Sequence, residues 1–286
     1  IKRLKERKST PSKQTKLLVL PSVVIAITFI LNFIGALVPE TFYDSLAYNI
    51  GLSQLWINSG KIFSTPFIEP SFFPLNITVL FTLGIILCDE ITAKLIVLAL
   101  GAGLVAATYK FCRKYLTGEA GQLAALIFYT VPTVMIISWK TSVEIGLGFY
   151  EFLAVFCFVN WSDEGKKKWL YLSGVFAGVS IGGKYTSFFT AVSLFLLYLL
   201  VSVKWNRKNM LEGLKTAFTF SLIGFLVSSV WFVKNLIITG NPLYPLLNKF
   251  GEMVTTGAEL KTIEFTPLNI LTFPWNYTMG KLQQET

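Results

Sequence analysis

The chain has 286 residues, and 25 Lys and Arg against 16 Asp and Glu give it a formal net charge of +9. Charged residues make up 14% and hydrophobic residues 53%, whereas a soluble domain carries about 25% charged residues. The chain therefore has too little polar surface for a soluble globule, and its hydrophobicity excludes disorder. Histidine is absent, which excludes a Ser-His-Asp triad and most zinc sites. An integral membrane protein is the class that remains.

A membrane-spanning helix needs about 20 mostly apolar residues, and seven stretches of this chain reach or approach that length. They are residues 17–38, 91–109, 121–139, 145–161, 169–182, 185–203 and 214–238. The stretch 169–182 is short, but the side chain of Lys168 at its end is long enough to reach the interface. We therefore expect an all-α fold, a polytopic transmembrane helix bundle with about seven spans.

Basic residues in short loops set the orientation of such a bundle. The tail 1–16 carries seven Lys and Arg, so we expect it to stay in the cytoplasm. The first span then takes the chain outside, into a first outer loop. An odd number of crossings must follow before the next basic cluster, so that this cluster lies in the cytoplasm. For that reason we expect the apolar run 72–88 to stay in the outer leaflet or to re-enter. Three further basic clusters should lie in the cytoplasm: residues 110–114, 166–168 and 204–208.

These crossings divide the chain into three parts. We expect a basic cytoplasmic tail at 1–16, a transmembrane module at 17–250 with a first outer loop at 39–90, and the start of an outer segment at 251–286. The chain begins with Ile1 and ends without a natural stop, so we expect it to be part of a longer protein. The location that follows is the plasma (inner) membrane, with the site on the outer or periplasmic face.

The first outer loop is the most informative stretch. Pro39 favours the start of a helix and Gly60 its end. On such a helix Glu40, Asp44 and Tyr48 follow one another at intervals of four residues and share one face, while apolar residues occupy another. The pattern predicts an amphipathic helix on the membrane surface. Its acids are either functional or merely solvated.

Three short motifs resemble one family of enzymes. Residues 43–49, Tyr-Asp-Ser-Leu-Ala-Tyr-Asn, resemble the first-loop motif of GT-C membrane glycosyltransferases, in the branch related to protein mannosyltransferases and aminoarabinose transferases. Residues 72–75, Phe-Phe-Pro-Leu, resemble the proline element that closes that loop. Residues 231–245 resemble the aromatic-basic-Asn and Gly-Asn-Pro-x-Tyr-Pro stretch. One departure is Asn49, where many relatives have His.

The resemblance implies inverting transfer of a sugar from a polyprenyl-phosphate donor to an acceptor hydroxyl on a glycolipid, glycan or protein. Such a transition state is oxocarbenium-like and needs a base for the hydroxyl and charge stabilisation for the leaving phosphate. Asp44 is the candidate base, since a carboxylate at a dehydrated membrane edge has a raised proton affinity. Glu144, in the second outer loop, is the second catalytic candidate or an acid that faces a favourable helix dipole. Nucleic acid is not expected as a partner.

Outer-face cations and the Gly-Asn-Pro turn supply the candidate binding residues. Lys184 is the first candidate for the phosphate, because the two glycines before it let backbone and ligand approach closely. No cofactor is expected: Asp44, Glu144 and Asp89 offer oxygen ligands for a divalent metal, but their spacing does not demand one. The candidate substrate-binding residues are Glu40, Tyr48, Lys140, Lys184, Lys234, Asn241 and Tyr244.

A lipid or solute transporter, or a flippase, is the alternative function. Transport favours ionisable groups near the bilayer midplane and helices broken at symmetric positions. Glu151, two turns deeper than Glu144, is one such intramembrane group. Most acids and lysines gather at one face beside a long amphipathic loop, which favours chemistry on a lipid substrate. A purely structural membrane subunit fits the composition but leaves these charges unexplained.

Overall fold

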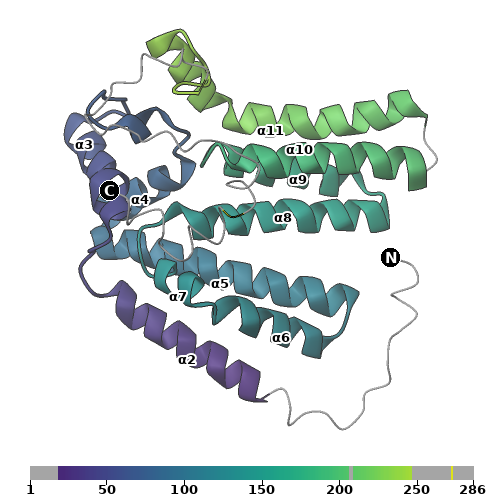
Figure 1. The fold of residues 1–286 in the computed structure, drawn as a ribbon, viewed down its shortest axis with the longest axis horizontal. Helices are drawn as coiled ribbons and strands as arrows, with labels where there is room; N and C mark the ends of the chain where they lie inside the picture. The colour runs from purple at the N-terminus through teal and green to yellow at the C-terminus, as the bar shows by residue number, and fades with distance from the viewer. Residues whose placement is uncertain (1–18, 206–208, 247–271, 273–286) are drawn as a thin grey trace. The chain divides into compact units, whose positions relative to one another are not determined.

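The computed structural model describes residues 19–205, 209–246 and 272. The predicted tail 1–16 lies outside the described residues, as does the predicted segment 251–286 apart from residue 272. Every regular element of the described chain is helical, so the predicted all-α fold is confirmed there (Figure 1). The α-helices are α2 (Val19–Ala36), α3 (Gly51–Ser59), α4 (Asn76–Leu87), α5 (Glu90–Tyr115), α6 (Gly118–Tyr129), α7 (Pro132–Ile137), α8 (Val143–Glu164), α9 (Lys167–Ile181), α10 (Ser187–Leu200) and α11 (Met210–Thr239).

Five helices in the described part of the chain are long and apolar enough to cross a membrane, against the seven predicted. The two other predicted spans are not single helices of that length. Residues 121–139 are divided into α6 and α7 at Pro132, because proline has no N–H to donate and favours the first position of a new helix. Residues 169–182 correspond to α9, which has 15 residues. The five are α2, α5, α8, α11 and Ser187–Lys204, which contains α10.

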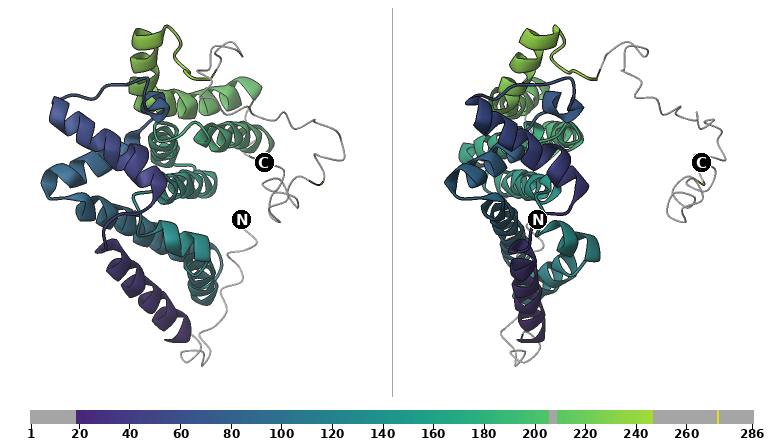
Figure 2. Two further views of the ribbon diagram at one scale, coloured as in Figure 1. Left: turned by 60° about the vertical axis from the view of Figure 1, so that its left-hand side comes forward. Right: turned by 90° about the vertical axis from the view of Figure 1, so that its left-hand side faces the viewer.

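The apolar run 72–88 forms the short helix α4. Its 12 residues rise about 18 Å, which is less than the roughly 30 Å hydrocarbon core of a bilayer. The Lys94 ammonium, near the start of α5, donates to the carbonyls of Gly35 and Val38 at the end of α2. The chain between α2 and α5 therefore leaves and rejoins the bundle at one end. We call this the loop end, where α2, α9 and α11 finish and α5, α8 and α10 begin (Figures 1 and 2).

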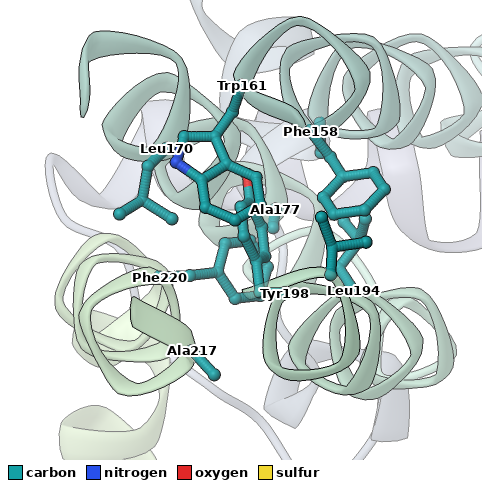
Figure 3. Close-up of a cluster of buried hydrophobic side chains, with 10 residues drawn as sticks. Phe158, Trp161, Leu170, Ala177, Leu194, Tyr198, Ala217 and Phe220 are labelled. Atoms are coloured by element: carbon teal, nitrogen blue, oxygen red, sulfur yellow. The ribbon is translucent and has the colours of Figure 1, made fainter. Parts of the chain in front are cut away.

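An aromatic core holds the opposite end together. It joins α8, α9, α10 and α11 around Tyr198, whose side chain is fully buried (Figure 3). The Tyr198 ring centroid lies 4.9 Å from that of Phe158, 4.7 Å from that of Trp161 and 5.0 Å from that of Phe220. These large rings bury apolar area from four helices at once, and paired rings add stabilisation beyond that area.

Helices α9 and α11 approach closely along small residues. A Cβ atom on Gly178 would lie 2.5 Å from the carbonyl oxygen of Gly224, and one on Gly174 would lie 2.9 Å from that of Phe220. Glycines four residues apart allow two membrane helices to pack backbone against backbone. This packing fixes the loop end of α9 beside that of α11.

The first-loop helix begins later than predicted. Residues 39–42 are not helical; the helix starts at Tyr43, runs as a π-helix over Ser45–Ile50 and continues as α3. It ends at Gly60, whose positive φ of 64° suits glycine. Glu40 therefore precedes the helix and does not share a helical face with Asp44 and Tyr48. The cause is local: one Glu40 oxygen accepts the N–H groups of Thr41 and Phe42 and fixes the backbone just before the helix.

Candidate functional site

Four of the predicted residues come together at the loop end. Asp44 and Tyr48 lie on the first-loop helix, Glu144 lies in the first turn of α8, and Lys184 lies between α9 and α10. Lys184 Nζ donates to Glu144 Oε1 over 3.0 Å, and the Asp44 carboxylate lies close enough to the Tyr48 hydroxyl to raise the pKa of Tyr48. We call these four residues the carboxylate–lysine cluster. It joins three segments that are far apart in the sequence.

Both carboxylates influence the Tyr48 hydroxyl. Burial raises the pKa of Tyr48, and the negative charges of Asp44 and Glu144 raise it further. Tyr48 therefore remains protonated at neutral pH.

The charged groups of this cluster remain reachable. The side chain of Lys184 is 42% exposed and that of Glu144 is 47% exposed, while Asp44 is half-buried. A ligand can therefore reach a cation and two acids in this described part of the loop end. Chemically, the cluster offers a proton acceptor and an anion-binding group in one site.

Glu40 does not lie with Asp44 and Tyr48, the residues with which its spacing in the sequence had grouped it. Its side chain is buried, with 7% of the residue exposed. One carboxylate oxygen accepts the N–H groups of Thr41 and Phe42, and the other accepts the N–H and hydroxyl of Thr141. Burial alone would raise the pKa of Glu40, but these hydrogen bonds hold it below the usual value of 4.5. The carboxylate is thus charged and already bonded on both oxygens.

The other two predicted lysines pack on aromatic rings. Lys140 Nζ lies 4.6 Å from the ring centroid of Phe42 and 5.4 Å from that of Trp139. Lys234 Nζ lies 5.0 Å from the ring centroid of Trp231 and donates to the Ser71 carbonyl over 2.7 Å. Neither ammonium forms an ion pair among the described residues.

The aromatic-basic-Asn motif of α11 forms a second cluster. Trp231 Nε1 donates to Asn76 Oδ1 over 2.8 Å, and Asn235 Nδ2 donates to the Phe72 carbonyl over 2.7 Å. We call Trp231, Lys234 and Asn235 the anchor cluster. All three side chains bond to residues 71–76, the predicted proline element and the start of α4. This part of the motif holds a loop in place.

The Gly-Asn-Pro turn is tied to the same structure. The Tyr244 carbonyl accepts hydrogen bonds from Tyr185 over 2.9 Å and from Asn235 over 3.2 Å, and the Tyr244 ring centroid lies 4.8 Å from that of Phe72. Asn241 bonds within the turn, donating to the Leu246 carbonyl over 2.8 Å. These hydrogen bonds of Asn241 and Tyr244 shape the turn.

The glycines before Lys184 have a packing role. A Cβ atom on Gly182 would lie 2.2 Å from Asn76 Nδ2, and one on Gly183 would lie 2.7 Å from Leu147. The Gly182 carbonyl also accepts the Asn76 N–H over 2.7 Å. Their small size thus allows α4 to reach the end of α9, which positions the turn that carries Lys184.

Sequence reasoning missed two important residues. Lys94 is fully buried and joins the end of α2 to α5; a lysine inside an apolar run was a usable signal, since such residues rarely lie in a membrane without a partner. Thr141 is also fully buried and bonds to Glu40, but no feature of the sequence distinguishes it from any other threonine.

Asn49, the one departure from the motif, is almost fully buried. Its Nδ2 donates to the Thr141 carbonyl over 2.8 Å, and its Oδ1 accepts from Thr78 over 3.0 Å. A neutral imidazole also carries one donor and one acceptor. The bridge made by Asn49 is therefore one that the His of the resembled motif is chemically able to make.

Glu151 accepts hydrogen bonds from Ser180 over 3.2 Å and from Thr190 over 3.0 Å. Asp89 caps α5 by accepting the N–H of Thr92 over 3.0 Å. Within the described residues, no group of three or more potential metal ligands is found.

Comparison with protein families decides the identity of the bundle. The sequence model of the family described as dolichyl-phosphate-mannose-protein mannosyltransferase matches residues 74–231, more than half of the chain. The chain belongs to this family. It is thus a membrane glycosyltransferase of the GT-C type, and the predicted resemblance is confirmed.

The matched residues include Glu144 and Lys184, whereas Asp44 and the anchor cluster's Lys234 and Asn235 lie outside them. Comparison with curated proteins and with solved structures returned no match. The family implies a lipid-linked sugar donor and an acceptor.

Proposed function

We propose that this glycosyltransferase moves a sugar from a polyprenyl-phosphate donor to an acceptor hydroxyl with inversion, and that Asp44 is the general base. The observation that supports the proposal is the carboxylate–lysine cluster. It places a proton acceptor, Asp44, and an exposed cation, Lys184, in one site at the loop end. These are the two groups that displacement at an anomeric carbon requires, one for the incoming hydroxyl and one for the leaving phosphate.

Asp44 acts on the acceptor. A hydroxyl attacks slowly at neutral pH unless a base takes its proton as the new bond forms. The half-buried Asp44 carboxylate accepts that proton, with the Tyr48 hydroxyl close beside it. The carbon–oxygen bond to the donor phosphate breaks as the bond to the acceptor oxygen forms, which gives inversion.

Lys184 receives the leaving phosphate. In the structure its ammonium is paired with Glu144, but both side chains are more than two fifths exposed. Exposed ion pairs of this kind contribute only about 0–1 kcal/mol. The donor phosphate therefore replaces Glu144 on the ammonium at low cost, and in its absence Glu144 keeps the ammonium oriented toward the site.

An apolar groove beside Lys184 supports a polyprenyl carrier. The groove has a volume of about 340 Å³ and lies between α9, α10 and α11. Phe188 and Phe232 line it, and the Tyr185 ring centroid lies 6.4 Å and 6.5 Å from theirs. Because Tyr185 directly follows Lys184, the groove reaches the turn that carries this lysine.

The deciding experiment compares Asp44→Asn with wild type in lipid vesicles that contain a polyprenyl-phosphate sugar. The amide keeps the shape and removes the base, so sugar transfer should fall by about 10²-fold or more while the protein still folds and binds the donor. Glu69→Gln, at an exposed acid of the same loop, is the matched control and should retain normal transfer. Near-normal transfer by Asp44→Asn would contradict the role of Asp44.

The proposed location of the site is the outer face of the plasma membrane. In a chain without its three cysteines, Phe67→Cys, at a residue 93% exposed, should react with an impermeant thiol reagent added outside cells. Lys166→Cys, whose lysine side chain is 61% exposed, should react only after the membrane is opened. The reverse pattern would place the site on the cytoplasmic face.

A further inference from the structure

Thr141 joins the two segments that carry the proposed catalytic acids. Its N–H and hydroxyl donate to Glu40 Oε2 over 2.9 Å and 3.1 Å. Its carbonyl accepts from Ser45 over 3.2 Å and from Asn49 over 2.8 Å. Every polar atom of Thr141 is therefore bonded to the first-loop segment, although about 90 or more residues separate them in sequence.

Glu40 completes this connection from the other side. While one oxygen holds Thr141, the other accepts the N–H groups of Thr41 and Phe42. Those two residues lead directly into the helix that carries Asp44, and Thr141 stands three residues before Glu144. A single buried carboxylate thus holds the chain just before Asp44 and the chain just before Glu144.

We infer that Glu40 and Thr141 are positioning residues that keep Asp44 in register with Glu144 and Lys184. This role rests on the proposed function of the cluster. It differs from substrate binding, because the Glu40 carboxylate accepts its four hydrogen bonds from protein groups and Thr141 is fully buried.

The geometry of the π-helix supports a positioning role. Ser45 and Asn49, which bond to Thr141, are buried. Asp44 and Tyr48 each precede one of these residues and are half-buried. The same turns of helix that bind Thr141 therefore present the proposed base to the site, so that a shift of Thr141 moves Asp44. A misplacement of about 1 Å is enough to lower a rate by about 10²-fold.

The test is a set of three variants whose kcat and donor KM are measured per folded molecule. Thr141→Val keeps the shape and removes the hydroxyl bond, and Glu40→Gln keeps the size and removes the charge. Each should lower kcat by about 10- to 100-fold and leave the KM for a polyprenyl-phosphate sugar nearly unchanged, because Lys184 and the groove are intact. Thr141→Ser restores the hydroxyl and should restore most of kcat.

Several outcomes would overturn this inference. Variants that unfold at lower temperature but keep the wild-type kcat would show a purely structural role, and a raised donor KM with normal kcat would show substrate contact. If Thr141→Val is not recovered folded, Glu40→Gln decides by the same criteria. An inactive Asp44→Asn beside a fully active Thr141→Val contradicts the positioning role alone, whereas a fully active Asp44→Asn contradicts the proposed function.

Discussion

Lys184 and Lys234 lie in two regions of the loop end that differ in structure. Both lysines were candidates for a donor phosphate, although only Lys234 lies within a glycosyltransferase-like motif. Lys184 faces the exposed carboxylate of Glu144, whereas Lys234 donates to the Ser71 carbonyl and covers the Trp231 ring. The first charge is available for exchange with a ligand, and the second is already used in holding a loop.

The reason lies in the backbone of the first loop. The last carbonyls of a helix need partners outside it, and Ser71 and Phe72 end the 3-10 helix Glu69–Phe72 of this loop. Their carbonyls accept from Lys234 and Asn235, and Asn235 also donates to the Tyr244 carbonyl after α11. The anchor cluster thus holds the first loop in place, and the carboxylate–lysine cluster keeps a fixed position as a result. Four predictions test this contrast.

The largest effect is expected at Lys184. Lys184→Ala should raise the donor KM or lower turnover by about 10- to 150-fold, since loss of a charged contact costs about 1.5–3 kcal/mol. The unfolding temperature should change little, because the ion pair is exposed. Steady-state kinetics and thermal unfolding in detergent measure the two quantities. Unchanged donor affinity and turnover would leave Lys140 or Lys234 as the phosphate ligand.

The opposite pattern is expected at Asn235, which is fully buried. Asn235→Ala leaves the Phe72 carbonyl without this donor and should lower the free energy of unfolding by about 1–3 kcal/mol. Asn58→Ala, at an exposed asparagine of α3, should change it by less than about 0.5 kcal/mol. If Asn235→Ala keeps full stability and weakens donor binding, the contrast between the two clusters is wrong.

The packing of α9 against α11 should hold both clusters at the loop end of the bundle. Gly178→Ala forces a methyl group against the Gly224 carbonyl and should destabilise the protein by about 1–3 kcal/mol. Gly118→Ala is the matched control, since a Cβ atom there has no neighbour within 4 Å. Equal unfolding temperatures for the two variants would show that this close approach is not needed.

The smallest effect is the pH dependence contributed by Glu40. Its pKa in the folded protein is lowered from 4.5 by hydrogen bonds that outweigh burial. The stabilisation is therefore complete above the unfolded value and is lost as pH falls through the folded value. The stability difference between wild type and Glu40→Gln should shrink below about pH 4.5, as measured by unfolding across pH. A difference that is constant with pH would contradict a charged Glu40.

Part of the site follows from local sequence and part does not. Asp44, Glu144 and Lys184 were proposed from the motif at 43–49, the acid of the second outer loop and the two glycines before the lysine. The pairing of Lys184 with Glu144 and the use of Glu40 were not predictable, since each depends on partners 40 and 101 residues away. Glu40 was assigned to a helical face by spacing alone, and its carboxylate instead bonds the backbone before that helix.

The amino-acid sequence by itself determined the membrane class, the all-α fold and the approximate position of most helices. These depend on apolar length and on local signals such as Pro132, Asp89 and Gly60, which act within a few residues. Tertiary structure alone decided which charged groups are exposed to a ligand and which are bonded to the protein backbone. It did so because a lysine has the same chemistry in every sequence, and only the groups packed around it determine whether it binds a carboxylate, a carbonyl or a ligand. Lys184 binds a carboxylate, whereas Lys234 and the buried Lys94 bind backbone carbonyls.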